Sequence, residues 1–189
     1  MAAARAGWKE KQPSLNPGRL FFLDETSVKT NMVREYGRAP RGERLVASAP
    51  HGHRKTSTFI GCLHEGGMAA PYVLDGAVNG ELFVAYIEQQ VVPNLARGDV
   101  LIMDNLPVHK AAGVRDALEA AGVGLLFLPA YSPDLNPIEM VFAKMKALLR
   151  KAAIRTLDAL WRALGKISQA LTREECANYF RHCGYVQSG

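Results

Sequence analysis

The stretch LLFLPAYSPDLNPIEMVFAKMK, residues 125–146, decides the fold because it joins three kinds of local structure in one run. Its first residues are an apolar run typical of a buried strand, and a loop containing Pro133 and Pro137 follows. Asn136 is a good helix N-cap, Pro137 suits the first helical position, and apolar residues then recur at helical spacing. The stretch therefore predicts a strand, a loop and an amphipathic helix.

Two further apolar runs lie upstream, and each ends in an acid. Leu20–Leu23 is followed by Asp24 and Glu25, and residues 99–104 read DVLIMD. Between these runs, TSTFIGCLHEGG and MAAPYVLDG predict an antiparallel hairpin, and the later strands alternate with helices. This order predicts an α/β fold, a mixed five-stranded sheet flanked by helices.

The length of 189 residues suits one domain with a substantial core. Residues 1–18 are predicted to be a lead-in segment that ends in a turn, and residues 19–189 to be the domain, with C-terminal helices beginning near Thr156 and Thr172. Hydrophobic residues make up 48% and charged residues 22%, a balance that excludes the disordered class.

Cysteine usage and hydropathy indicate the compartment. Three cysteines without a CxxC pair fit neither a disulfide framework nor a zinc ribbon. No apolar run approaches the roughly 20 residues that a membrane span needs. We therefore expect a soluble, cytoplasmic protein. The net charge of +5 is compatible with nucleic-acid binding but is weak support for it.

Asp24, Asp104 and Glu139 are the candidate catalytic and metal-binding residues. The first two are expected at the carboxyl ends of their strands, where ligand sites of open α/β sheets lie, and Glu139 falls in the first turn of the predicted helix. Converging carboxylates need cations, and oxygen-only ligands favour Mg²⁺ or Mn²⁺. Two such ions roughly 4 Å apart would clamp a phosphodiester. In this arrangement Asp24 bridges both ions.

Plain structural explanations stand beside this hypothesis. An acid after a strand is often a turn residue, and Glu139 would also favour the helix macrodipole. Glu25 is expected on the opposite face of its strand, and Asp134 is the substitute ligand if Glu139 faces away. Asn105 either orients a ligand or closes a turn.

The segments LFFLDET, VLIMDNLPVHK and LLFLPAYSPDLNPIEMVFAKMK together resemble the catalytic domain of insertion-sequence transposases related to the mariner group. That group belongs to the DDE superfamily and has a ribonuclease H-like fold. The resemblance runs from about Trp8 to Tyr185, and it places the catalytic positions of the family on Asp24, Asp104 and Glu139. The 34 residues between the last two match one spacing used in the group.

Two departures from the family pattern bear on activity. Ser27 stands where an aromatic residue is expected after the DET run in many relatives. Relatives also carry helix-turn-helix DNA-binding segments before the catalytic domain, whereas 23 residues precede Asp24 here.

Basic side chains in two regions are candidate DNA contacts. One region is the arginine-rich excursion after Arg34, and the other is the basic face of the helix that carries Glu139. A solvated surface explains both regions equally well. His109 is expected either to contact the scissile phosphate or, more commonly, to be a surface histidine. The DNA-binding candidates are Arg41, Arg44, Arg54, Lys55, His109, Lys146 and Arg150.

The resemblance implies metal-dependent cleavage of double-stranded DNA at the element ends, followed by transfer of the freed 3′ hydroxyl to target DNA. It also implies a homo-oligomer on DNA. Two alternatives stay open: a ribonuclease H-like nuclease without strand transfer, and an inactive truncated or split transposase subunit whose helix-turn-helix segments lie on a separate subunit.

Overall fold

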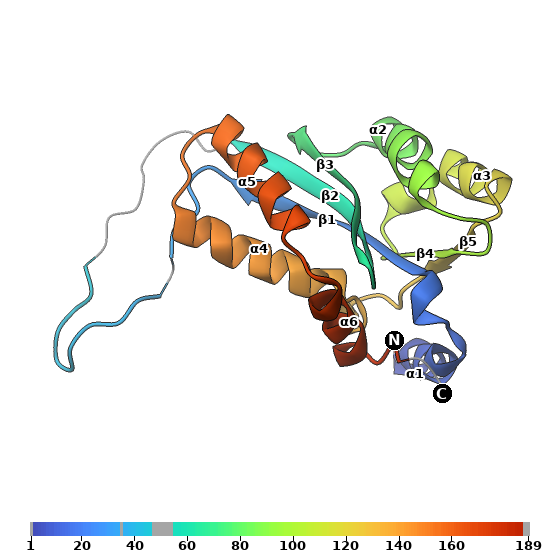
Figure 1. Ribbon diagram of the computed structural model, residues 1–189, viewed down its shortest axis with the longest axis horizontal. Helices are drawn as coiled ribbons and strands as arrows, with labels where there is room; N and C mark the ends of the chain where they lie inside the picture. Colours follow the sequence, from blue (N-terminus) through green and yellow to red (C-terminus); the bar gives the residue numbers. More distant parts are fainter. Residues whose placement is uncertain (1, 35, 47–54, 187–189) are drawn as a thin grey trace.

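The structure is a computed structural model that describes residues 2–34, 36–46 and 55–186. Its centre is one five-stranded mixed sheet, and helices pack on both faces, as the sequence predicted (Figure 1). The strand order is β3-β2-β1-β4-β5. The strands are β1 (Leu20–Lys29), β2 (Thr56–His64), β3 (Gly67–Asp75), β4 (Val100–Met103) and β5 (Gly124–Phe127).

The sheet combines an antiparallel half with a parallel half. β1, β2 and β3 pair antiparallel, whereas β4 pairs parallel with β1 and β5 pairs parallel with β4. The parallel half arises because helices connect its strands, and a parallel connection must cross over the sheet. The helices are α1 (Ala2–Lys11), α2 (Gly80–Tyr86), α3 (Ala112–Ala120), α4 (Ile138–Ala152), α5 (Leu157–Gln169) and α6 (Arg173–His182).

Alternation along β1 sorts its side chains between two cores. Leu20, Phe22 and Val28 join the apolar cluster formed with α4, α5 and α6. Phe21 and Leu23 join the cluster formed with α2 and α3. Successive side chains of a strand point to opposite faces, so neighbouring residues at the site also face different cores.

The length of β1 corrects one prediction. Asp24 was expected at the carboxyl end of its strand, but β1 continues to Lys29 through its antiparallel pairing with β2. On the other side of β1, only Leu20–Leu23 of its described residues pair with β4. Asp24 is therefore in the middle of its own strand and directly beyond the end of its neighbour. The sheet edge at which the acids were expected to meet is formed by the shorter strand.

Side-chain caps begin three of the helices. Asn79 accepts a hydrogen bond from Leu82 N, Thr156 from Ala159 N and Thr172 from Glu175 N. These bonds satisfy backbone N–H groups that have no partner within the helix. The helix starts near Thr156 and Thr172 are therefore confirmed.

The start of α4 differs from its prediction. Asn136 was predicted to cap this helix, but no side-chain cap hydrogen bond is made there. The Asn136 amide instead reaches Asp24. The side chain is therefore directed toward Asp24 and not toward the start of the helix.

The two segments outside the predicted strands and helices behave differently. α1 packs onto the body through the buried Trp8, which belongs to the α4–α6 core cluster. Residues 36–46 have no regular secondary structure and extend away from the sheet (Figure 1). In the described part of the chain, no helix has the length and apolar character needed to cross a bilayer.

Candidate active site

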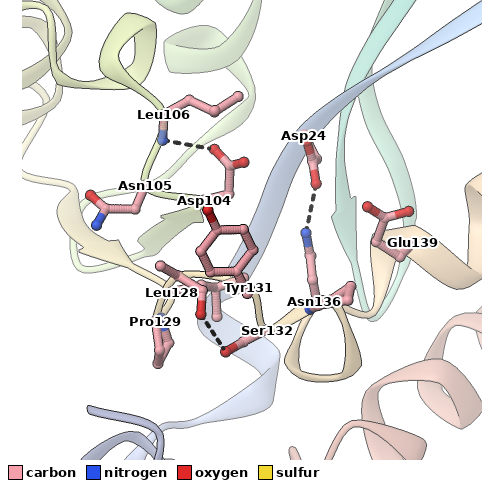
Figure 2. Close-up of a pocket in the computed structure, with 12 residues that line it drawn as sticks. Asp24, Asp104, Asn105, Leu106, Leu128, Pro129, Tyr131, Ser132, Asn136 and Glu139 are labelled. Carbon is pink, nitrogen blue, oxygen red and sulfur yellow. Dashed lines mark hydrogen bonds between the residues drawn. The ribbon is translucent and has the colours of Figure 1, made fainter. Parts of the chain in front are cut away.

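The three predicted catalytic acids line a single cavity of about 350 Å³ beside the end of β4 (Figure 2). Asp24 comes from β1, Asp104 follows β4, and Glu139 lies in the first turn of α4. The rest of the wall is the loop between β5 and α4, together with Asn105 and Leu106. Residues distant in the sequence thus meet at the sheet edge. Whether they carry the chemistry remains a prediction.

Asp24 is buried on the side of the sheet that carries α4. Its Oδ1 accepts a hydrogen bond from the Glu25 backbone N–H at 2.8 Å, and its Oδ2 accepts one from Asn136 Nδ2 at 2.8 Å. Burial raises the pKa of Asp24 to about 7; the backbone hydrogen bond opposes this, whereas the charges of Asp104, Glu25 and Glu139 add to it. A cation in the cavity would favour the ionised carboxylate.

Asn136 is a site residue that sequence reasoning missed. Its side chain is buried and donates to Asp24, and in the described part of the chain its Oδ1 has no hydrogen-bond partner. An unpaired buried carbonyl oxygen is costly, and here it belongs to a residue that lines the cavity. The available signal was the position of this asparagine three residues before Glu139, but helix-capping chemistry explained the same residue more simply.

His109 corrects a second prediction. Its side chain has no exposed surface, so it is not a surface histidine. Its Nδ1 lies 2.6 Å from Asp104 Oδ1, and its Nε2 lies 3.0 Å from Glu25 Oε2. Burial lowers the pKa of His109, but hydrogen bonds and charge from Asp104 and Glu25 outweigh it and raise the pKa to about 10. We call these three residues the imidazole bridge.

The prediction for Glu25 is confirmed. It follows Asp24 directly but faces the opposite side of β1, where it meets His109. Asp134, considered as a substitute for Glu139, does not line the cavity. It is paired with Arg5, whose Nη1 and Nη2 donate to its two carboxylate oxygens at 2.8 and 2.7 Å.

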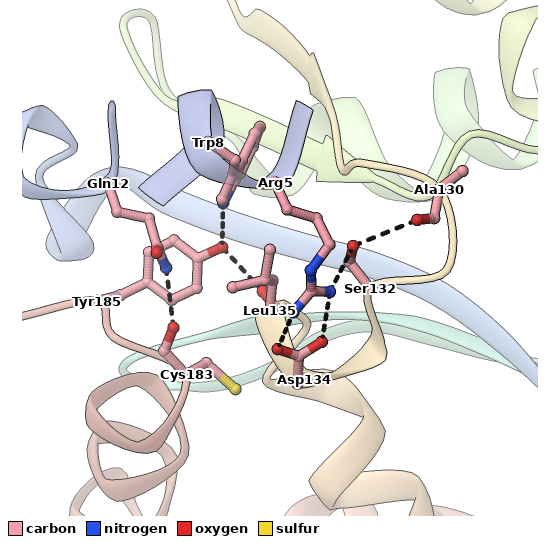
Figure 3. A network of polar contacts seen from close by, with 9 residues as sticks. All are labelled: Arg5, Trp8, Gln12, Ala130, Ser132, Asp134, Leu135, Cys183 and Tyr185. Carbon is pink, nitrogen blue, oxygen red and sulfur yellow. Dashed lines mark hydrogen bonds and ion pairs between the residues drawn. The ribbon is translucent and has the colours of Figure 1, made fainter. Parts of the chain in front are cut away.

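The loop that precedes Glu139 is held from both ends of the described chain (Figure 3). Arg5 also donates to Ser132 Oγ at 2.8 Å. Trp8 Nε1 donates to Tyr185 OH at 3.0 Å, and Tyr185 OH donates to the Leu135 carbonyl at 2.8 Å. We call Arg5, Trp8 and Tyr185 the loop brace. It fixes the segment that delivers Asn136 and Glu139 to the cavity.

The donor set of the cavity fits a hard divalent cation. Its ionisable ligands are carboxylates, and the unpaired Asn136 Oδ1 adds a neutral oxygen. Oxygen ligands of this kind suit Mg²⁺ and Mn²⁺. Within residues 2–34, 36–46 and 55–186, no group of three or more His, Cys, Asp or Glu side chains is arranged to hold one ion together. Repulsion between carboxylates opposes such convergence until a cation is present.

The predicted DNA contacts occupy different places. Arg41 and Arg44 are exposed on the extended segment, Lys55 is exposed before β2, and Arg54 lies outside the described residues. Lys146 and Arg150 line a second hollow with Ser27 and Lys29. This hollow follows β1 and α4, the same two elements that supply Asp24 and Glu139.

Comparison with known proteins gives one family and related transposases. Residues 19–161 match the family described as DDE superfamily endonuclease. The Tcb1 transposase of Caenorhabditis briggsae is 26% identical over 184 residues, covering 85% of this chain and 66% of that protein. The Tc1 transposase of Caenorhabditis elegans is 29% identical over 116 residues, covering 61% and 41%. The chain thus spans between two-fifths and two-thirds of these relatives.

Solved structures of the Mos1 transposase share the fold. The Mos1 strand transfer complex superposes with a TM-score of 0.78 at 18% identity, covering 96% of this chain and 56% of that chain. The Mos1 catalytic domain with raltegravir and Mn has a TM-score of 0.71 at 20% identity, covering 95% and 87%. This likeness confirms the predicted ribonuclease H-like α/β fold.

Proposed function

The chain belongs to the DDE superfamily endonuclease family, and we propose that it is a transposase catalytic domain that cleaves DNA strands and joins them to a target. One observation carries the proposal: Asp24, Asp104 and Glu139 reach one open cavity from three separate elements. If all three acids lay on one helix, a local sequence pattern would be enough to bring them together. Bringing them together across the sheet depends on the whole fold.

We propose that these three carboxylates bind two Mg²⁺ or Mn²⁺ ions, with Asp24 shared between them. Structures of the Mos1 catalytic domain with Mn and with Mg are among the similar folds, which supports this choice of metal. When bound, such ions activate the attacking hydroxyl and stabilise the leaving oxygen of a phosphodiester. Asn136 would keep Asp24 oriented through its Nδ2 hydrogen bond.

DNA is proposed to lie across the cavity and along the hollow between β1 and α4. Lys29, Lys146 and Arg150 line that hollow and would contact phosphates without reading sequence. Arg41 and Arg44 would reach a more distant part of the duplex from the extended segment. The Mos1 paired-end complex with its left transposon end supports element ends as the substrate. A homo-oligomer on DNA and a separate helix-turn-helix subunit are further proposals.

The test is Mn²⁺-dependent nicking and strand transfer on supercoiled plasmid. We expect metal-dependent nicked and joined products from the wild-type chain, and their loss in Asp104→Asn, because the substitution removes a ligand charge. Asp116→Asn is the matched control, since Asp116 is exposed on α3 and does not line the cavity. Circular dichroism checks that each variant is folded.

The products separate the alternatives. Joined molecules single out a transposase, whereas cleaved molecules without joined ones indicate a nuclease. A folded chain that binds Mn²⁺ but yields neither product needs a DNA-binding partner. Equal activity of wild type and Asp104→Asn would overturn the assignment of the site.

A further inference from the structure

A buried histidine lies behind the cavity and contacts one of its acids. His109 has no exposed surface, whereas the Asp104 side chain is 36% exposed and lines the cavity. The two are separated by 2.6 Å between Nδ1 and Oδ1. His109 is absent from the cavity lining. It therefore contacts a predicted metal ligand without lining the cavity itself.

The ring of His109 has little freedom to turn. It packs against the Phe83 ring with centroids 4.7 Å apart and an interplanar angle of 30°. Its second nitrogen, Nε2, faces Glu25 Oε2 at 3.0 Å, so a carboxylate holds each end of the imidazole. Glu25 itself is held in the central strand of the sheet, where it pairs with Ile60 of β2, two residues beyond the last residue that pairs with β4. The sheet thus sets the position of the ring, and the ring faces Asp104.

Asp104 needs such support because it follows the last residue of a short strand. β4 ends at Met103, and Asp104 Oδ1 otherwise accepts a weaker hydrogen bond from Leu106 N at 3.2 Å. A partly exposed carboxylate at a strand end has several rotamers available. His109 Nδ1 lies 2.6 Å from Asp104 Oδ1 as an ion pair and 3.3 Å from the Asp104 carbonyl oxygen, so the fixed ring favours one of these rotamers.

We propose that His109, anchored by Glu25, is a positioning residue that holds the Asp104 carboxylate in the orientation needed to bind a divalent cation. The inference deepens the proposed function, because it assigns the support of one proposed metal ligand. Outer partners of this kind orient ligands without touching the metal, and their loss commonly weakens metal affinity about 10- to 100-fold.

Two substitutions of His109 separate its two contacts. In His109→Asn, the amide nitrogen occupies roughly the place of Nδ1 and can still donate to Asp104. In His109→Gln, the amide nitrogen extends toward the place of Nε2 and faces Glu25 instead. Both variants are neutral and smaller than histidine, so they differ mainly in which carboxylate keeps a donor.

The measurement is Mn²⁺ affinity of the whole chain without DNA, read from the electron paramagnetic resonance signal of free Mn²⁺. We expect His109→Gln to weaken binding about 10-fold or more, and His109→Asn to recover much of the loss. His64→Gln is the control, because this histidine stacks on Phe21 and bonds the Gly18 carbonyl away from the cavity. Its affinity should equal that of the wild type.

Thermal unfolding of each variant shows whether a change in affinity reflects lost structure. Equal Mn²⁺ affinity in folded wild type, His109→Gln and His109→Asn overturns the proposal, as does equal weakening by both substitutions. Absence of Mn²⁺ binding by the wild type overturns it as well. Mn²⁺ binding by a wild-type chain that cleaves no DNA counts against the proposed function, while the comparison of the two His109 variants still decides this inference.

Discussion

The two sides of the sheet support the candidate site by different means. On the side of α2 and α3, the imidazole bridge places a ring between Asp104 and Glu25, and its strength lies in charge and direction. On the side of α4 to α6, the loop brace holds the loop before Glu139 through the packing of Trp8 and a chain of hydrogen bonds. The bridge is electrostatic and adjoins a predicted catalytic acid, whereas the brace combines the buried Trp8 with hydrogen bonds and an exposed ion pair to the loop.

Because the two supports differ in this way, we expect one to control metal affinity and the other to control stability. The bridge consists of three ionisable side chains, and it determines where the Asp104 carboxylate points. The brace joins residues more than a hundred positions apart in the sequence and contributes to the main core. Substitutions in the bridge should therefore change metal affinity more than stability, and substitutions in the brace should do the reverse.

The largest effect on stability is expected from Trp8→Ala. Removing this buried indole leaves a cavity in the core cluster and should lower the free energy of unfolding by about 3–5 kcal/mol. Tyr185→Phe is the control that removes hydrogen bonds and keeps the ring, with an expected loss of about 1–3 kcal/mol. Urea unfolding measures both. A Trp8→Ala variant that loses much Mn²⁺ affinity but keeps its stability would contradict the proposed difference between the loop brace and the imidazole bridge.

Asp24, on the α4 side of the sheet, should make the stability of the metal-free chain depend on pH. Because burial raises its folded-state pKa to about 7, its contribution to stability is full below its ordinary pKa and is lost as pH rises to about 7. The shift corresponds to about 4 kcal/mol. Unfolding in EDTA between pH 4 and pH 8 should show this fall in wild type and not in Asp24→Asn. Parallel pH profiles of the two proteins would contradict it.

Arg5→Ala should have the smallest effect, because the Arg5–Asp134 ion pair is largely exposed. Hydrogen bonding to Arg5 lowers the pKa of Asp134, so the pair stabilises the fold above the ordinary pKa of aspartate and is lost as pH falls through the lowered value. Urea unfolding at neutral and acid pH should show a small difference from wild type that disappears in acid. A loss as large as that of Trp8→Ala would mean that charge dominates the brace.

Much of the fold could be predicted because its signals are local. Apolar runs located β1, β2, β4 and β5, and capping threonines located the starts of α5 and α6. The family resemblance also held, since residues 19–161 match the DDE superfamily endonucleases. For the site, the three acids were named from strand ends and a helix start, and the structure brings them to one cavity.

Residues whose role depends on a distant partner could not be predicted in the same way. Asn136 reads as a helix cap from its neighbours, and only the packing of α4 against β1 directs its amide to Asp24. His109 reads as a surface residue, and only the pairing of β1 with β4 places Glu25 and Asp104 at either end of its ring.

The sequence by itself determined the order of strands and helices, the faces that are apolar and the family. Periodicity, turn residues and caps act within a few positions, so short stretches of the chain are enough to specify these features. The tertiary structure decided that Asp24 lies in mid-strand beside the end of a shorter neighbour, that a histidine is buried behind Asp104, and that α1 braces the loop before Glu139. Each of these depends on the register of strands or the packing of helices that are far apart in sequence. Such contacts form only when the whole sheet is assembled.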